Sequence, residues 1–320
     1  MKQVLIKNGV AVEIVDFDIE NATQEQCNVI KDVLRNNVLV VVKNQSKAPG
    51  HFTKFISQIG KIANYKQFNW DPITAEECYL PTQDQKFINP DDWPNPETYP
   101  VQRVSGKKID GKRTGIFGSG VLDWHANLNG LDRADGVALQ GYEYCSGTST
   151  TFLNNAVAYD EMPQELIDRC KGVHCEYIYS PELWASGLPE KQLKTMTTTV
   201  PGIAQGKEVY KMWLIQENIA GRKGIYFYTN NRCKVITEDK KLFDDLYDYL
   251  FQEKFMYTME YEPGDIILSD QLLSLHKRDQ NDPEILAKRV LHRLTFQLSN
   301  AEKWIRKQNE NINTTADMEI

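Results

Sequence analysis

The sequence contains no long apolar run. No stretch approaches the roughly 20 consecutive apolar residues that a membrane-spanning helix needs, and the first residues do not begin a signal peptide. Positive charge is not in excess either, because 37 Lys and Arg stand against 44 Asp and Glu, for a net charge of -7. Such a chain has no general attraction to phosphate backbones. We therefore expect a cytoplasmic protein that binds neither membranes nor nucleic acids.

Cysteine is scarce and forms no motif. The six cysteines are scattered, without a CxxC pair and without the density of a disulfide scaffold, which argues against a zinc ribbon or a disulfide-stapled domain. Internal repeats, low-complexity tracts and a convincing interdomain linker are missing as well. We expect residues 1–320 to form a single domain, and the sequence leaves a homo-oligomer open.

Hydrophobic periodicity predicts both helices and strands. A capping box at residues 23–26, followed by apolar residues at helical spacing, predicts an N-terminal helix. The β-branched run 38–42 predicts a buried strand, and a second helix should end at Gly60. Further helices are predicted at 159–170 and 239–251, and further strands at 224–228 and 265–268, the last one entered through a turn at 262–265.

Two long segments have little periodicity. Residues 61–120 are rich in Pro, Asn, Asp and aromatic side chains, and residues 180–206 hold several Pro and Gly but few regularly spaced apolar positions. Long loops on a β scaffold are often active-site lids. We expect both segments to be lid-like insertions that consist mostly of loop.

The strand predicted at residues 121–128 carries a candidate metal site. Alternation places its apolar residues, from Leu122 to Leu128, on one face and Asp123, His125 and Asn127 on the other. A histidine and an oxygen ligand two residues apart can reach the same ion, which is half of a 2-His-1-carboxylate iron site. A carboxylate is expected at the second position, and the chain has the amide of Asn127 instead.

A second histidine, His276, lies far downstream and is followed by a strand at 289–298. Alternation puts Arg289 and Arg293 on one polar face and His292 on the opposite, apolar face. An arginine that faces a cavity needs an anionic partner, because an unpaired buried charge is costly, and its planar fork suits a carboxylate. A bound dicarboxylate would supply that partner. For Arg293, pairing with a structural carboxylate is the alternative.

These residues belong to an ordered set of motifs. Residues 124–127 occupy the place of a Trp-His-x-Asp motif, residues 147–159 are similar to a Gly-Gly-Asp-Thr…Ala-Ala-Tyr segment, residues 264–276 are similar to a Gly-Asp…Trp-Asp-Asn…His strand, and residues 289–293 match a closing Arg-x-x-His-Arg. Each motif alone is weak, but their order and spacing are specific. Over nearly its whole length the chain resembles the taurine dioxygenase (TauD/TfdA) family of iron(II)/2-oxoglutarate-dependent oxygenases.

The resemblance implies a fold and a set of roles. The fold is mainly β with α additions: a double-stranded β-helix (jelly-roll, cupin-like) core flanked by helices. His125 and His276 would bind iron(II), with Asn127 at the carboxylate position. Arg289, helped by the Thr150 hydroxyl, would bind the distal carboxylate of 2-oxoglutarate, although turn hydrogen bonds are the ordinary explanation for such a threonine.

The implied activity is that of a dioxygenase. It would consume O2 and 2-oxoglutarate and hydroxylate a small-molecule substrate, most simply an anionic or amino-acid-like metabolite. Arg293 would lie near the co-substrate and could hold an anionic group of the substrate. The remaining histidines, His51, His174 and His292, are interpreted as structural.

Asn127 leaves four interpretations open. An amide offers a neutral and weaker oxygen ligand than a carboxylate. In the first interpretation Asn127 ligates the metal weakly, and in the second Asp123 replaces it as the ligand. In the third the position is vacated for an exogenous anion, and in the fourth the site is impaired. The third interpretation makes a radical halogenase the alternative function, although Asn is larger than the Gly or Ala that related halogenases carry. The fourth makes the protein a catalytically impaired binding protein on the same fold.

Overall fold

The computed structural model describes residues 1–62, 89–99, 101–109, 112–113, 115, 117–118, 120–126, 134–179, 208–227, 233–298 and 301–312. Its strands are β1 (Lys2–Ile6), β2 (Ala11–Val15), β3 (Leu39–Val42), β4 (Lys61–Ile62), β5 (Gln102–Ser105), β6 (Lys108–Ile109), β7 (Lys112–Arg113), β8 (Leu122–His125), β9 (Gly136–Glu143), β10 (Ser149–Asn154), β11 (His174–Tyr179), β12 (Glu208–Trp213), β13 (Ile215–Glu217), β14 (Lys223–Ile225), β15 (Cys233–Ile236), β16 (Met256–Glu260), β17 (Ile266–Asp270), β18 (Ser274–Arg278) and β19 (Val290–Gln297). The α-helices are α1 (Gln24–Asn37), α2 (Pro49–Ile59), α4 (Asn155–Asp160), α5 (Gln164–Cys170), α8 (Leu242–Leu250), α9 (Pro283–Leu286) and α10 (Ala301–Asn309). Short 3-10 helices are η1 (Lys7–Gly9), η3 (Pro90–Asp92), η4 (Pro96–Thr98) and η6 (Glu253–Phe255).

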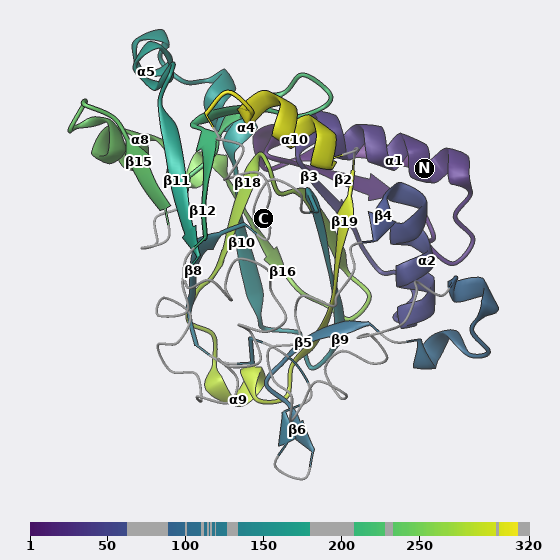
Figure 1. The fold of residues 1–320 in the computed structure, drawn as a ribbon. Helices are drawn as coiled ribbons and strands as arrows, with labels where there is room; N and C mark the ends of the chain where they lie inside the picture. The colour runs from purple at the N-terminus through teal and green to yellow at the C-terminus, as the bar shows by residue number, and fades with distance from the viewer. Residues whose placement is uncertain are drawn as a thin grey trace.

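Two sheets build the core (Figure 1). The larger sheet has the order β1-β2-β3-β17-β9-β19-β4, with β5 also paired to β19, and the smaller has the order β16-β10-β18-β8. Side chains of both sheets line a single pocket, so the two sheets face each other across it. The predicted double-stranded β-helix flanked by helices is confirmed.

Helices α1 and α2 cover the outer face of the larger sheet (Figure 1). Ile30 and Leu34 of α1 and Phe55 of α2 are fully buried against Leu268 of β17 and Leu294 of β19. Burying an aliphatic or aromatic side chain of this size contributes roughly 1.5–3 kcal/mol. The packing therefore fixes the sheet that carries the pocket on its other face.

The predicted ends of these helices are confirmed for two different physical reasons. The Gln26 N–H donates to the Thr23 hydroxyl over 3.2 Å, and the Thr23 N–H donates to the Gln26 side chain over 3.0 Å, which completes the capping box. Helix α2 ends before Gly60, whose φ of -162° is extended. A Cβ on Gly60 would lie 2.2 Å from the Gln297 carbonyl oxygen, so close approach to β19 requires glycine there.

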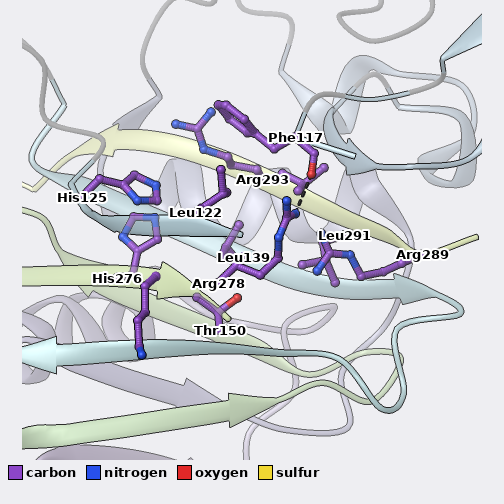
Figure 2. Close-up of a pocket in the computed structure, with 12 residues that line it drawn as sticks. Phe117, Leu122, His125, Leu139, Thr150, His276, Arg278, Arg289, Leu291 and Arg293 are labelled. Atoms are coloured by element: carbon purple, nitrogen blue, oxygen red, sulfur yellow. Dashed lines mark hydrogen bonds between the residues drawn. The ribbon is translucent and has the colours of Figure 1, made fainter. Parts of the chain in front are cut away.

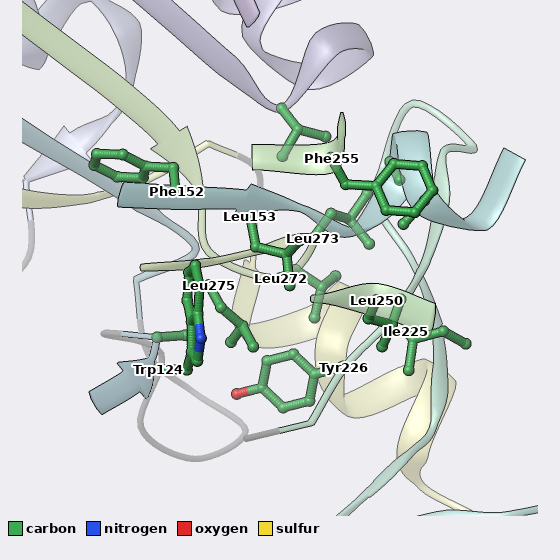
Figure 3. Packing of buried hydrophobic residues seen from close by; sticks show 14 of the residues in the cluster. Trp124, Phe152, Leu153, Ile225, Tyr226, Leu250, Phe255, Leu272, Leu273 and Leu275 are labelled. Carbon is green, nitrogen blue, oxygen red and sulfur yellow. The ribbon is translucent and has the colours of Figure 1, made fainter. Parts of the chain in front are cut away.

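A second apolar cluster lies behind the smaller sheet (Figure 3). Leu153 of β10 and Leu275 of β18 point away from the pocket into this cluster, where they join Leu250 of α8. The Trp124 ring lies 5.2 Å from the Phe251 ring, centroid to centroid. Each sheet is thus packed on its outer face and leaves its inner face to the pocket.

Some predicted elements are corrected. The helix predicted at 159–170 is two helices, α4 and α5, because Pro163 has no N–H to continue the first of them. Helix α8 is shorter than the predicted 239–251. The predicted turn before β17 is present, and Gly264 has a φ of 94°, which suits glycine.

The first predicted insertion is not all loop. Strand β5 pairs with β19 from Arg293↔Gln102 to Val290↔Ser105 and therefore extends the larger sheet. Strand β5 was not predicted, because the edge of β19 supplies partners that the local sequence does not reveal. Residues 63–88 and 180–207 lie outside the described residues. Within the described part of the chain, no helix is both long and apolar enough to cross a bilayer.

Candidate active site

The pocket between the two sheets encloses, together with the space at its open mouth, about 450 Å³ of empty volume. Figure 2 shows two imidazoles at one end and the Arg289 guanidinium at the other. The described residues that line the pocket include three arginines but no Asp or Glu. Its polar lining comes from His125, Thr150, His276, Lys277, Arg278, Arg289 and Arg293.

The structure brings together the two histidines that the sequence placed 151 positions apart. His125 of β8 is the register partner of His276 of β18, and their ring centroids are 4.2 Å apart. The Phe152 ring stacks on His276 at 5.5 Å and supports it from the neighbouring strand. Two imidazoles at this separation can donate to one metal ion.

The alternation predicted for residues 121–128 holds at Trp124 and His125 but fails at Leu122. His276 pairs with His125 but Arg278 pairs with Leu122, so β8 has one residue more than β18 between the two pairs. This β-bulge turns both Leu122 and His125 toward the pocket, although alternation would put them on opposite faces. Asp123 falls within the bulge and is exposed.

The backbone of the bulge orients His125. The His125 Nδ1 lies 2.6 Å from the carbonyl oxygen of Asp123, and since a carbonyl only accepts, Nδ1 carries the proton. Nε2 is then the nitrogen that can donate a lone pair. A hydrogen bond from the second ring nitrogen is a common way to fix the tautomer of a metal-binding histidine.

His276 is held neutral. Its side chain is buried, and burial, followed by the charges of His125 and Arg293, keeps the pKa of His276 well below its usual range. A neutral imidazole is the form that binds a metal.

Arg289 is a buried, charged residue of the pocket whose hydrogen-bond donors are not satisfied among the described residues. It is 1% exposed, and none of its three side-chain nitrogens has a hydrogen-bond partner among the residues that the structure describes. Burial lowers its pKa, while Tyr261 and Cys145 act in the opposite direction. A buried charge without a partner is expensive, so the site fits an anionic ligand. A carboxylate matches the guanidinium fork.

Thr150 and Arg293 lie in the same pocket as Arg289. Thr150 belongs to β10, and Arg293 is 4% exposed on β19. The Arg293 Nη1 donates to the Gln102 side-chain oxygen of the paired strand β5 over 2.5 Å. Gln102 is neutral, so this contact orients Arg293 without cancelling its charge.

The sequence analysis missed Arg278. It is 3% exposed, and in Figure 2 it lies between the imidazoles and Arg289. Its Nε donates to the Gly120 carbonyl over 3.0 Å, and its Nη1 to the Phe117 carbonyl over 2.5 Å. Burial and then Arg289 lower its pKa to about 10, which leaves it charged at neutral pH. Its position two residues after His276 on one strand was the available signal.

The described residues fit a metal site only in part. No third His, Cys, Asp or Glu joins His125 and His276 anywhere in the described chain. Asn127 lies outside the described residues. The two facing imidazoles and the fixed tautomer of His125 suit a metal, and the partnerless Arg289 suits a dicarboxylate at the opposite end.

His292, in contrast, is structural. Its ring is 1% exposed, stacks on Tyr142 at 4.1 Å and on Phe52 at 6.5 Å, and its Nδ1 lies 3.2 Å from the Gln140 side-chain oxygen. Burial, with Arg103 adding to it, lowers its pKa to about 3. His292 therefore packs between the larger sheet and α2, away from the pocket.

The buried His292 should make the fold sensitive to acid. The unfolded chain binds a proton on this ring below about pH 6.5, whereas the native chain does not until about pH 3, so stability falls as the pH falls through this window. Between pH 7 and pH 5 the wild type should lose about 2 kcal/mol more unfolding free energy than His292→Phe. Urea unfolding at both pH values measures the difference. Equal losses would show that His292 is not the cause.

Between the two sheets of the jelly roll lie two facing histidines and a buried arginine that has no hydrogen-bond partner among the described residues. These residues suit a metal ion and a dicarboxylate. The sequence model of the "Taurine catabolism dioxygenase TauD, TfdA family" matches residues 5–295. The chain belongs to this family.

Curated relatives are distant. Pentalenolactone F synthase of Streptomyces arenae is 22% identical over 205 residues, which is 59% of this chain and 67% of that protein. The alpha-ketoglutarate-dependent 2,4-dichlorophenoxyacetate dioxygenase of Burkholderia sp. (strain RASC) is 24% identical over 155 residues, 47% of this chain and 48% of that protein. The matches thus span from about half to two thirds of the relatives' length.

Solved structures share the fold. AAD-2, crystallised with Mn(II) and N-oxalylglycine, has a TM-score of 0.61 at 13% identity, covering 92% of this chain and 96% of that one. A taurine dioxygenase from Burkholderia xenovorans has a TM-score of 0.56 at 15% identity, covering 89% and 85% of the two chains.

Proposed function

We propose that the protein is an Fe(II)/2-oxoglutarate-dependent oxygenase that hydroxylates a small anionic or amino-acid-like metabolite. The observation that carries this proposal is the buried Arg289 guanidinium, partnerless among the described residues, in one pocket with the facing imidazoles of His125 and His276. Family membership and the printed name of an alpha-ketoglutarate-dependent relative support it.

In this proposal, His125 and His276 hold the iron, with Asn127 at the third position. When bound, iron(II) would activate O2, which is the oxidant, and 2-oxoglutarate would supply two electrons through its oxidation to succinate and CO2. Arg289 neutralises the distal carboxylate of 2-oxoglutarate, and the Thr150 hydroxyl donates to it. These residues position the co-substrate along the line from Arg289 to the imidazoles.

The substrate side of the proposal rests on Arg293. Arg293 lines the pocket, is 4% exposed and is oriented by Gln102, and its guanidinium fork suits an anionic group. We assign Arg293 to a carboxylate or similar anion of the substrate. The apolar walls around it, Leu139 and Leu291 among them, keep water away from the reacting carbon.

Turnover of 2-oxoglutarate tests the function. The purified protein, with iron(II) and O2, should convert 2-oxoglutarate to succinate, and a panel of amino acids and small carboxylic acids should accelerate the conversion when one of them is a substrate. His276→Ala should abolish turnover, since it removes one of the two proposed imidazole ligands. The proposed function would be contradicted if the wild-type protein neither bound iron(II) anaerobically nor formed succinate.

Radical halogenation is the second candidate, and Asn127 is the observation that favours it. Without a carboxylate at this position, an exogenous anion such as chloride could complete the metal site. Product masses measured with and without chloride distinguish the two outcomes. A chlorine-bearing product would show that the protein is a halogenase and not a hydroxylase. The roles proposed for Arg289 and Thr150 would not change.

A further inference from the structure

Tyr261 continues the strand that pairs with Thr150, one of the two residues of the proposed carboxylate site. It follows β16, and its N–H donates to the Thr148 carbonyl over 3.1 Å, which continues the register in which Met259 pairs with Thr150. Paired residues of antiparallel strands share a face, so Tyr261 lies on the same side of the small sheet as Thr150. Its side chain is 1% exposed.

The Tyr261 hydroxyl is a buried polar group whose hydrogen bonds are not satisfied among the described residues. It makes no hydrogen bond of standard geometry with any described residue. Two neighbours nevertheless act on it: burial raises the pKa of Tyr261, while the Thr150 hydroxyl and the Arg289 charge oppose that rise. Leaving a buried hydroxyl without a hydrogen-bond partner is destabilising. The Tyr261 hydroxyl therefore lies near the Thr150 hydroxyl and the Arg289 guanidinium, and among the described residues the hydrogen bonds of Tyr261 and Arg289 are incomplete.

We propose that Tyr261 is a positioning residue for the co-substrate: its oxygen accepts from Arg289 while its proton is donated to the Thr150 oxygen, which turns the Thr150 hydroxyl toward the distal carboxylate. The inference rests on the proposed function, because 2-oxoglutarate supplies that carboxylate. Tyr261 does not line the pocket itself, so it acts through the two residues that do. Hydrogen bonds in such a chain strengthen one another.

The chain offers a matched control in Tyr257. This second phenol, on β16, is partly buried, whereas Tyr261 is fully buried, and its hydroxyl contacts the Met259 sulfur at 3.8 Å. Tyr→Phe removes one oxygen at either position and leaves the ring in place. A general effect of losing a buried phenol should appear in both variants, and an effect on the carboxylate site only in Tyr261→Phe.

Binding of 2-oxoglutarate is measured by calorimetry under Mn(II), and by thermal shift without metal. Tyr261→Phe should raise the Kd and the KM for 2-oxoglutarate about 3- to 10-fold, leave kcat unchanged, and leave the melting temperature of the ligand-free protein unchanged or higher. Tyr257→Phe should leave the Kd at the wild-type value. In a Thr150→Val background, Tyr261→Phe should add little, because the residue through which it acts has been removed.

The outcomes separate the inference from the function. Wild-type protein that does not bind 2-oxoglutarate overturns the proposed function, and the inference with it. Wild-type binding together with an unchanged Kd in Tyr261→Phe overturns the inference alone. A full effect of Tyr261→Phe in the Thr150→Val background, or a lower melting temperature of the ligand-free variant with an unchanged Kd, also overturns it, since either result gives Tyr261 another role.

Discussion

Arg289→Met should raise the Kd for 2-oxoglutarate at least about 100-fold, equivalent to about 2.7 kcal/mol. The guanidinium is 1% exposed and has no hydrogen-bond partner among the described residues. The variant would therefore lose a charge-assisted, bidentate contact that only the ligand completes. Methionine keeps most of the volume of the side chain and its apolar contacts.

The same substitution should not weaken the ligand-free fold. Removing a buried charge that lacks a counterion is neutral or stabilising, because its desolvation cost disappears. The melting temperature of ligand-free Arg289→Met should thus equal or exceed that of the wild type, while the shift produced by 2-oxoglutarate is lost. Weaker binding of 2-oxoglutarate together with an unchanged or higher melting temperature of the ligand-free protein distinguishes a ligand-binding arginine from a structural one.

A surface arginine provides the control. The Arg222 side chain is 30% exposed and forms an ion pair with Asp160 away from the pocket lining, so Arg222→Met should leave the Kd for 2-oxoglutarate unchanged. Calorimetry under Mn(II) measures both variants. If Arg289→Met bound 2-oxoglutarate within threefold of the wild type, Arg289 would not be the partner of the distal carboxylate.

Local sequence was sufficient to predict the elements that satisfy their own hydrogen bonds. The capping box at Thr23 predicts the start of α1 because both of its hydrogen bonds join residues three apart. The alternation of β19 predicts that Arg289 and Arg293 share the pocket, because the bulge in that pairing lies on β9 and leaves β19 regular.

Elements that depend on a distant partner could not be predicted in this way. The bulge in β8 arises from its pairing with β18, and it turns Leu122 and His125 to one side, against the alternation of the sequence. Arg278 and Tyr261 join the site because β18 and β16 both flank β10. Arg278 carries no local signal beyond its spacing of two residues from His276, and Tyr261 carries none.

Asn127→Asp should raise the affinity of the protein for iron(II) at least about 100-fold, the second large effect that we expect. A carboxylate adds a negative charge next to a dication, in a pocket whose described lining has positive side chains and no acid. Cobalt(II), titrated anaerobically and followed by its absorption, reports metal binding without turnover.

Asn127→Ala is the companion variant, because it removes the amide oxygen without adding charge. If Asn127 ligates the metal weakly, the alanine variant binds cobalt(II) less tightly than the wild type. If the position is vacated for an anion, alanine leaves the affinity unchanged or higher, and chloride increases it further. Asp123 is an unfavourable substitute ligand, since its side chain is exposed and its carbonyl already accepts from His125.

Turnover by Asn127→Asp then decides what the natural asparagine does. When the aspartate variant binds metal tightly and forms more succinate than the wild type, the scaffold is catalytic and Asn127 limits it. When it binds metal tightly but forms no succinate, the remaining pocket does not support oxygen chemistry, and the protein is a binding protein on an oxygenase fold. An unchanged metal affinity would mean that residue 127 does not reach the ion, and the third ligand would have to come from another part of the chain or from solution.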